Sequence, residues 1–226
     1  MTNAVTKIAV VGLGAVGGAF AGLLSTLPPS HNLHLSAIAR GQALAALQAQ
    51  GLVWTDASGQ RHQVALTASD DPADLGPQDV VIVAVKGPSL AAVAPVVQQL
   101  LAPHTVVLVA MNGVPWWFFE GLGGSCDGLK LPVLDPQGVI AQCIPTSQVL
   151  GCVVHFSAQS PAAGVVQNMK GNQLIIGKRL GEVIIRAMLQ PLRQIGERAR
   201  GIALERFEQG NVGTVHEIFS QCCVSD

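Results

Sequence analysis

Three glycines at fixed spacing form the most informative motif of the chain, Gly12-Leu13-Gly14-Ala15-Val16-Gly17. The motif follows an apolar run that is predicted to be a strand, and it opens a small-residue segment that is predicted to be a helix. In this position Gly12 permits a tight turn and Gly17 allows close helix–strand packing, while Gly14 lets a pyrophosphate approach the backbone. The free N–H groups of the helix N-terminus would bind the diphosphate. The sequence therefore predicts a dinucleotide site, with a glycine-rich core turn as the alternative.

The charge that follows the second predicted strand, residues 34–39, indicates which dinucleotide is bound. A site for NAD usually has an Asp or Glu about 20 residues after the glycine motif, where it binds the ribose 2′-hydroxyl. This chain has no acidic residue before Asp56, and the strand ends instead at Arg40. A guanidinium suits a 2′-phosphate, so we expect NADP (NADPH) as the cofactor. The alternative is a solvated arginine at a strand end.

Two further polar residues follow uninterrupted apolar strands, which are predicted at residues 79–85 and 105–111. Lys86 comes directly after the first of these strands and Asn112 directly after the second. In an open parallel sheet, ligands bind at the carboxyl ends of the strands. Lys86 could neutralise a cofactor phosphate or hold its ribose, and the Asn112 amide could bind cofactor or substrate. The alternatives are a surface lysine and a simple Asn-Gly turn.

These residues need a scaffold in which several strands end at one edge, and the order of elements supplies it. Strands alternate with predicted helices at residues 15–27, 41–50 and 89–101, and Ser58-Gly59 indicates a hairpin. This order predicts an α/β fold, a Rossmann-like, doubly wound and mostly parallel sheet. Further strands are expected at residues 149–157, 164–167, 173–177 and 202–205, with a helix at residues 182–198.

Composition excludes several classes of protein. The formal net charge is -1 and only 12% of residues are charged, so no basic face is available for nucleic acid. The uncharged stretch at residues 8–30 is long enough to cross a membrane, but its glycines indicate a strand–helix turn, and no secretory signal precedes it. The five cysteines have no C-x-x-C spacing, so we expect reduced thiols, no metal site and a cytoplasmic location.

Taken together, the motifs resemble the ketopantoate reductase (2-dehydropantoate 2-reductase) family over residues 7–219. The resemblance lies in GLGAVGG, IARGQALAALQAQGL, DVVIVAVK, MNGVPWW and GCVVHFSAQSPAAGVV. It implies that the glycine motif, Arg40, Lys86 and Asn112 contact NADPH, that Asn112 also touches the substrate, and that Ser157 makes a further cofactor contact. The implied reaction reduces 2-dehydropantoate, a small 2-oxo acid, to pantoate on the route to pantothenate and coenzyme A.

The chain departs from this family near its C-terminus. In the family a lysine that opens a second, all-helical domain protonates the developing alkoxide. Here the segment at residues 216–221 resembles the helix that carries it, but the catalytic position falls on Gln221, whose neutral amide cannot deliver a proton. We therefore expect an NADP-binding domain at residues 1–208 and only a stub of the helical domain at residues 209–226. The uncovered apolar face would favour association of copies.

Three functional hypotheses remain open. The first is an active NADPH-dependent ketopantoate reductase, and the second is a catalytically impaired NADP-binding module that lacks the helical substrate domain. A third, another 2-oxo acid or 3-hydroxy acid dehydrogenase, fits Lys86 and the run at residues 112–115 less well. We expect His155 to be a core or cleft-edge residue, and the four aromatic residues at positions 116–119 to pack rather than stack on a ligand. Cys222 and Cys223 are expected to be exposed thiols.

Overall fold

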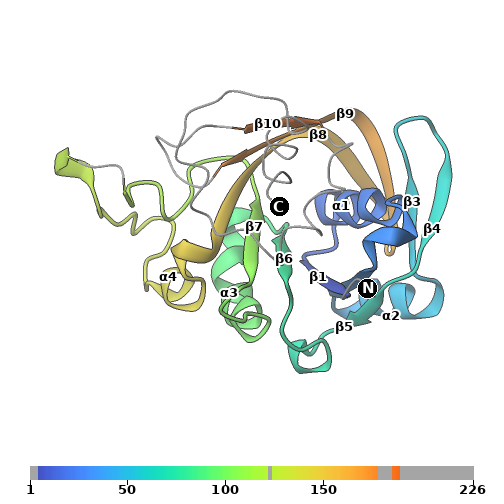
Figure 1. The fold of residues 1–226 in the computed structure, drawn as a ribbon, viewed down its shortest axis with the longest axis horizontal. Coiled ribbons are helices and arrows are strands. Elements are labelled where there is room, and N and C mark those ends of the chain that lie inside the picture. Colours follow the sequence, from blue (N-terminus) through green and yellow to red (C-terminus); the bar gives the residue numbers. More distant parts are fainter. Residues whose placement is uncertain (1–4, 122–123, 178–184, 189–226) are drawn as a thin grey trace, which may run out of the picture.

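The computed structural model describes residues 5–121, 124–177 and 185–188 (Figure 1). Its strands and α-helices are β1 (Thr6–Val11), α1 (Ala15–Ser25), β2 (Leu33–Ile38), α2 (Gly41–Gln50), β3 (Leu52–Thr55), β4 (Arg61–Val64), β5 (Thr67–Ser69), β6 (Val80–Val83), α3 (Leu90–Gln99), β7 (Val106–Ala110), α4 (Val139–Cys143), β8 (Val149–Ala162), β9 (Val165–Gly177) and β10 (Ile185–Met188). Short 3-10 helices lie at Pro29–His31, Pro72–Asp74, Gly87–Ser89, Gly124–Cys126 and Thr146–Gln148.

The strands form one mixed sheet in the order β4-β3-β9-β8-β7-β6-β1-β2-β5, with β10 paired to β9. Its central part is parallel, because β8, β7, β6, β1, β2 and β5 all run in the same direction. Antiparallel pairing occurs between β3 and β4, between β8 and β9, and between β9 and β10. The sheet is therefore Rossmann-like and mostly parallel, as the sequence predicted.

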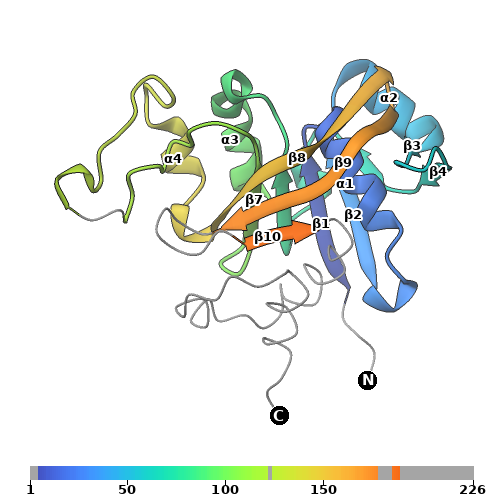
Figure 2. The ribbon, with the colours of Figure 1, turned by 90° about the horizontal axis from the view of Figure 1, so that it is seen from above.

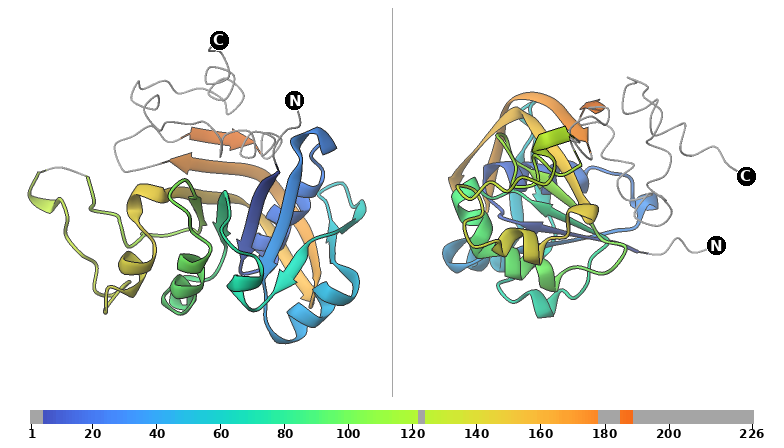
Figure 3. Two further views of the ribbon diagram at one scale, coloured as in Figure 1. Left: turned by 60° about the horizontal axis from the view of Figure 1, so that its bottom comes forward. Right: turned by 90° about the vertical axis from the view of Figure 1, so that its left-hand side faces the viewer.

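Helices cover both faces of the parallel strands, because alternate residues along each strand point to opposite sides. In β1, Ile8 and Val10 pack into a core with residues of α1 and α2, while Ala9 and Val11 pack into a second core with residues of α3 and α4. Figure 3 shows α3 and α4 side by side on one face of the sheet. The fold is doubly wound, as expected.

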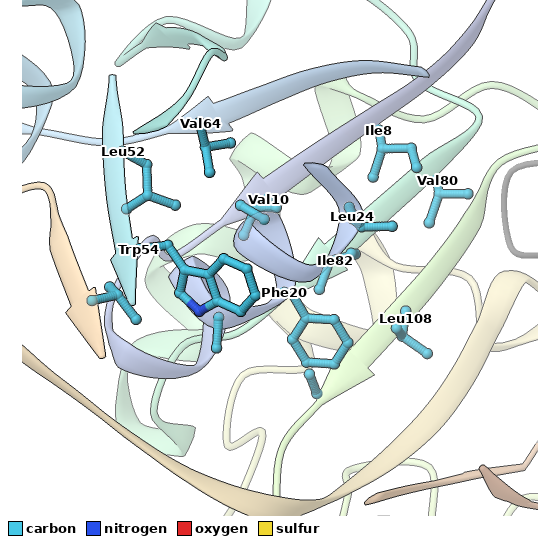
Figure 4. Packing of buried hydrophobic residues seen from close by; sticks show 14 of the residues in the cluster. Ile8, Val10, Phe20, Leu24, Leu52, Trp54, Val64, Val80, Ile82 and Leu108 are labelled. Carbon is cyan, nitrogen blue, oxygen red and sulfur yellow. The ribbon is translucent and has the colours of Figure 1, made fainter. Parts of the chain in front are cut away.

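The long β8–β9 hairpin curls around α1 and joins the parallel strands to β3 (Figures 1 and 2). Phe20 of α1 meets Phe156 of β8 edge to face, with ring centroids 5.9 Å apart. Two helix glycines allow this close packing: a Cβ on Gly18 would lie 2.5 Å from Val166, and one on Gly22 would lie 2.2 Å from the Trp54 ring. Figure 4 shows Trp54 and Phe20 in the resulting core.

Two expectations about the second half are wrong. The segments expected at residues 164–167 and 173–177 are parts of one continuous strand, β9, which begins at Val165, and Ile185–Met188 form β10 rather than part of a helix. Pairing along the otherwise open edge of β9 satisfies backbone hydrogen bonds, and it overrides the helical pattern in this segment. The rest of the expected helix, the expected strand at residues 202–205 and the stub at residues 209–226 lie outside the described residues, as does the boundary at residue 208.

Candidate functional site

The carboxyl ends of four neighbouring strands, β2, β1, β6 and β7, meet at one edge of the sheet, and β8 passes this edge near its start, at Cys152. Val11 of β1 is paired with both Ile38 and Val83, Val83 is paired with Val109, and Ala110 is paired with Cys152 of β8. A residue predicted to bind a ligand follows each of these four ends within three positions: Arg40 after β2, Gly12 after β1, Lys86 after β6 and Asn112 after β7. The fold therefore brings these residues, which are far apart in sequence, to a common edge.

The three glycines of the motif differ in what an added Cβ would meet. Gly12 has φ +94°, and a Cβ there would lie 2.6 Å from Val85 Cγ1. A Cβ on Gly17 would lie 2.2 Å from the carbonyl oxygen of Gly12. The turn and the helix–strand contact therefore require these two glycines. A Cβ on Gly14, in contrast, would meet nothing within 4 Å, so this exposed residue faces open space in the described structure.

The N-terminus of α1 is suited to an anion. Gly14 is its N-cap and supplies no side-chain hydrogen bond, and the first turn contains no acidic residue. The first N–H groups of a helix have no acceptor within the helix, and the helix dipole adds partial positive charge there. Leu13, Ala15 and Val16 complete this turn and are half-buried. The arrangement offers backbone donors to a diphosphate, with the open space at Gly14 in front of them.

Two exposed cations flank this turn along the sheet edge. Arg40 has an extended backbone and is the N-cap of α2, and Lys86 precedes the 3-10 helix Gly87–Ser89. Both residues are exposed. Neither side chain has an ion pair or hydrogen bond to the residues that the structure describes. Both charges are therefore available to an anionic ligand, on opposite sides of the glycine turn.

Asn112 has a structural role that the sequence did not reveal. Its Nδ2 donates to the carbonyl oxygen of Val154 at 3.1 Å, and its Oδ1 accepts from the backbone N–H of Val154 at 2.8 Å. The β7–β8 ladder ends at Ala110 and Cys152, so the amide continues it by one further step. One N–H and one lone pair of the amide remain for a ligand. The Asn112 amide therefore has enough donors and acceptors to hold β8 and to contact a ligand at the same time.

Other candidate residues lie elsewhere. Ser157 is exposed on the part of β8 that pairs only with β9, where its Oγ donates to the carbonyl oxygen of Lys170 at 3.3 Å. It is therefore not placed at the ends of the parallel strands. His155 is also exposed, so of the expected core and cleft-edge positions the core is excluded. Gln221 lies outside the described residues.

Two tryptophans of the aromatic run and two of the cysteines are buried in the hydrophobic cores. Trp116 and Trp117 are buried against α3 and α4, with ring centroids 4.3 Å apart, as expected for packing residues. The described cysteines, Cys126, Cys143 and Cys152, are free thiols, and burial raises the pKa of Cys152 to about 12. Within the described ranges, no group of three or more His, Cys, Asp or Glu residues could hold a metal ion, and no helix is long and apolar enough to cross a bilayer.

Comparisons with known proteins point to one family. The model of the family described as "Ketopantoate reductase PanE/ApbA" matches residues 8–181. A curated 2-dehydropantoate 2-reductase of Mesorhizobium japonicum is 36% identical over 176 residues, which are 78% of this chain and 53% of that protein. The chain thus spans about half the length of this relative.

Solved structures show the same likeness. A candidate ketopantoate reductase from Ralstonia solanacearum MolK2 is 45% identical and superposes with a TM-score of 0.72, over 77% of this chain and 53% of that one. A D-mandelate dehydrogenase, solved with NADH and anilino(oxo)acetate, is 16% identical with a TM-score of 0.58, over 94% of this chain and 58% of that one. At that identity the second likeness concerns the fold alone.

Proposed function

The chain belongs to the ketopantoate reductase family PanE/ApbA, and on that premise we propose that it binds NADPH and takes part in the reduction of 2-dehydropantoate to pantoate. The observation that carries this proposal is the sheet edge at which Gly14, Arg40 and Lys86 are exposed, where neither cation has an ion pair or hydrogen bond to the described residues. Backbone donors in the middle and a cation on each side match a dinucleotide, whose negative charges are spread over two or three phosphates.

In this proposal each residue has a separate task. The N-terminus of α1 holds the diphosphate, and the absent side chain of Gly14 leaves room for it. Arg40 binds the 2′-phosphate, which gives the preference for NADPH over NADH. Lys86 neutralises charge beside the glycine turn or holds a ribose hydroxyl. The free donor and acceptor of Asn112 bind nicotinamide ribose or substrate, while its other two bonds fix β8.

When bound, NADPH supplies a hydride to the ketone carbon of the substrate. The alkoxide that develops must then take up a proton. The family resemblance assigns that step to a lysine, and the matching position in this sequence is Gln221. Gln221 favours the second candidate function, an NADP-binding module of low catalytic competence. Both candidates share the same cofactor site, and they differ only in turnover.

The proposal also includes the setting of the reaction. A small 2-oxo acid is the expected substrate, and the free thiols at the three described cysteines are consistent with a cytoplasmic location. Association of copies, and the contribution of Ser157 to cofactor binding, stay predictions.

The test is a two-stage assay of the purified chain. NADPH binding is first measured by the change in nicotinamide fluorescence, and NADPH oxidation is then followed by absorbance with 2-dehydropantoate as substrate. Binding with turnover supports an active reductase. Binding without turnover supports the impaired module. Failure of the folded chain to bind NADPH contradicts both, and turnover with a different 2-oxo acid in preference to 2-dehydropantoate contradicts the proposed substrate.

A further inference from the structure

An acidic turn lies beside Arg40 at the sheet edge, although the two are far apart in sequence. Strand β5 pairs in parallel with β2, with Ser69 opposite Ile38. The backbone N–H of Ala39 then donates to the carbonyl oxygen of Ser69 at 3.0 Å, which extends the pairing past the end of β2. Arg40 and Asp70 each follow directly after these bonded residues. Their positions are therefore neighbours at the edge proposed to bind the adenosine end of the cofactor.

Hydrogen bonds hold this turn in a defined conformation. The buried Ser69 hydroxyl accepts from the backbone N–H of Asp71 at 3.0 Å and donates to Asp74 Oδ2 at 2.6 Å. Asp71 Oδ1 accepts from the backbone N–H of Ala73 at 2.9 Å. Two of the three carboxylates are thus used by the turn itself. Asp70 is exposed, and its carboxylate has no hydrogen bond or ion pair among the described residues.

We propose that Asp70 is a specificity-determining residue that limits how strongly the site prefers NADPH over NADH; this rests on the proposed function. A phosphate ester carries about −1.5 to −2 charges at neutral pH. Arg40 attracts the 2′-phosphate, whereas the negative charge of Asp70, directly after the neighbouring strand, repels it. NADH has a neutral hydroxyl at this place and is insensitive to that repulsion. The site therefore balances one cation against a carboxylate, and it accepts both cofactors with a moderate preference.

The test compares the dissociation constants of NADPH and NADH for the wild-type chain and Asp70→Asn. Removal of one solvent-exposed charge is expected to raise the preference for NADPH by about threefold to tenfold at low ionic strength. The increase should shrink in high salt, because exposed charges are screened. A general loss of structure would instead weaken the binding of both cofactors equally and would leave the ratio of their dissociation constants unchanged.

The matched control is Glu120→Gln, which also removes one negative charge. Glu120 pairs with Lys130 at 3.2 Å, in the segment between β7 and α4 that projects away from α2 and β5 (Figure 1). Glu120→Gln should leave the ratio of the NADPH and NADH dissociation constants within about twofold of the wild-type value, since charges beyond a Debye length are screened. An unchanged ratio in Asp70→Asn, while the wild type binds NADPH, overturns the role of Asp70 and leaves the proposed function standing. A wild-type chain that binds neither cofactor overturns the proposed function and this inference with it.

Discussion

The side-chain amide of Asn112 forms two hydrogen bonds to the backbone of Val154, one through Nδ2 and one through Oδ1. The contact joins β7 to β8 one step beyond their last backbone pair. From this point β8 leaves the parallel sheet and continues with β9 around α1. A residue predicted from sequence as a ligand contact thus fixes the start of the hairpin.

Replacement of Asn112 by Asp tests the two hydrogen bonds between the Asn112 side chain and the backbone of Val154. The carboxylate keeps an acceptor for the N–H of Val154 and places a second oxygen against its carbonyl. Loss of the donor and repulsion between the oxygens should lower the free energy of unfolding by about 1–3 kcal/mol. Urea denaturation measures this, with Gln98→Glu on the exposed surface of α3 as the control. Equal stability of Asn112→Asp and wild type would contradict the structural role.

The glycine motif gives a matched pair of alanine variants. Gly14→Ala should fold normally, because its φ of -83° suits alanine and an added Cβ meets nothing within 4 Å. Its methyl group occupies the space proposed for the diphosphate, so NADPH affinity should fall at least tenfold. Gly17→Ala should instead lose about 1–3 kcal/mol of stability, since its Cβ would lie 2.2 Å from a backbone oxygen.

Thermal denaturation and NADPH titration of both variants distinguish the two reasons for glycine. Wild-type NADPH affinity in Gly14→Ala would contradict the proposed diphosphate position, and wild-type stability in Gly17→Ala would contradict the packing requirement at Gly17.

Arg40→Gln removes the cation proposed to bind the 2′-phosphate and keeps a side chain of similar length. A charge-assisted hydrogen bond contributes about 1.5–3 kcal/mol, so NADPH affinity should fall by roughly tenfold to a hundredfold. NADH affinity should change by less than about twofold, because NADH has no group for this charge to bind. Fluorescence titration with both cofactors measures the two effects. Equal losses for NADPH and NADH would place Arg40 elsewhere on the dinucleotide.

The β3–β4 hairpin predicts a pH dependence of stability. The Ser58 hydroxyl donates to Asp56 at 2.6 Å, and the His62 ring lies 3.0 Å from its other oxygen. These bonds, that of Ser58 first, hold the pKa of Asp56 well below its ordinary value. Because the folded-state pKa is lowered, the contribution to stability is present above the unfolded-state value of about 3.9 and is lost as pH falls through the folded-state value.

Asp56→Asn should therefore be less stable than the wild type at neutral pH, and the difference should shrink steadily below about pH 4. Urea denaturation at a series of pH values measures both curves. Parallel curves for the two proteins at acidic pH would show that Asp56 does not contribute in this way.

The first half of the fold could be predicted because its signals are local. Apolar runs, the glycine motif and the stop at Gly51, whose φ is +71°, each act within a few residues. The curl of β8 and β9 could not be predicted, because it depends on distant contacts such as Trp54 Nε1 to Asn168 Oδ1 at 3.1 Å. The candidate site likewise has a part that could be predicted and a part that could not. Arg40 and Lys86 follow their own strands, whereas the bonds of Asn112 and the position of Asp70 depend on strand register.

The sheet edge that carries the glycine motif, Arg40 and Lys86 is proposed to bind NADPH. The most direct measurement is a calorimetric titration of NADPH into the folded wild-type chain. We expect saturable binding with one NADPH per chain, and competition by NADP⁺ at the same site. Absence of saturable heat, with circular dichroism showing a folded chain, would contradict the account.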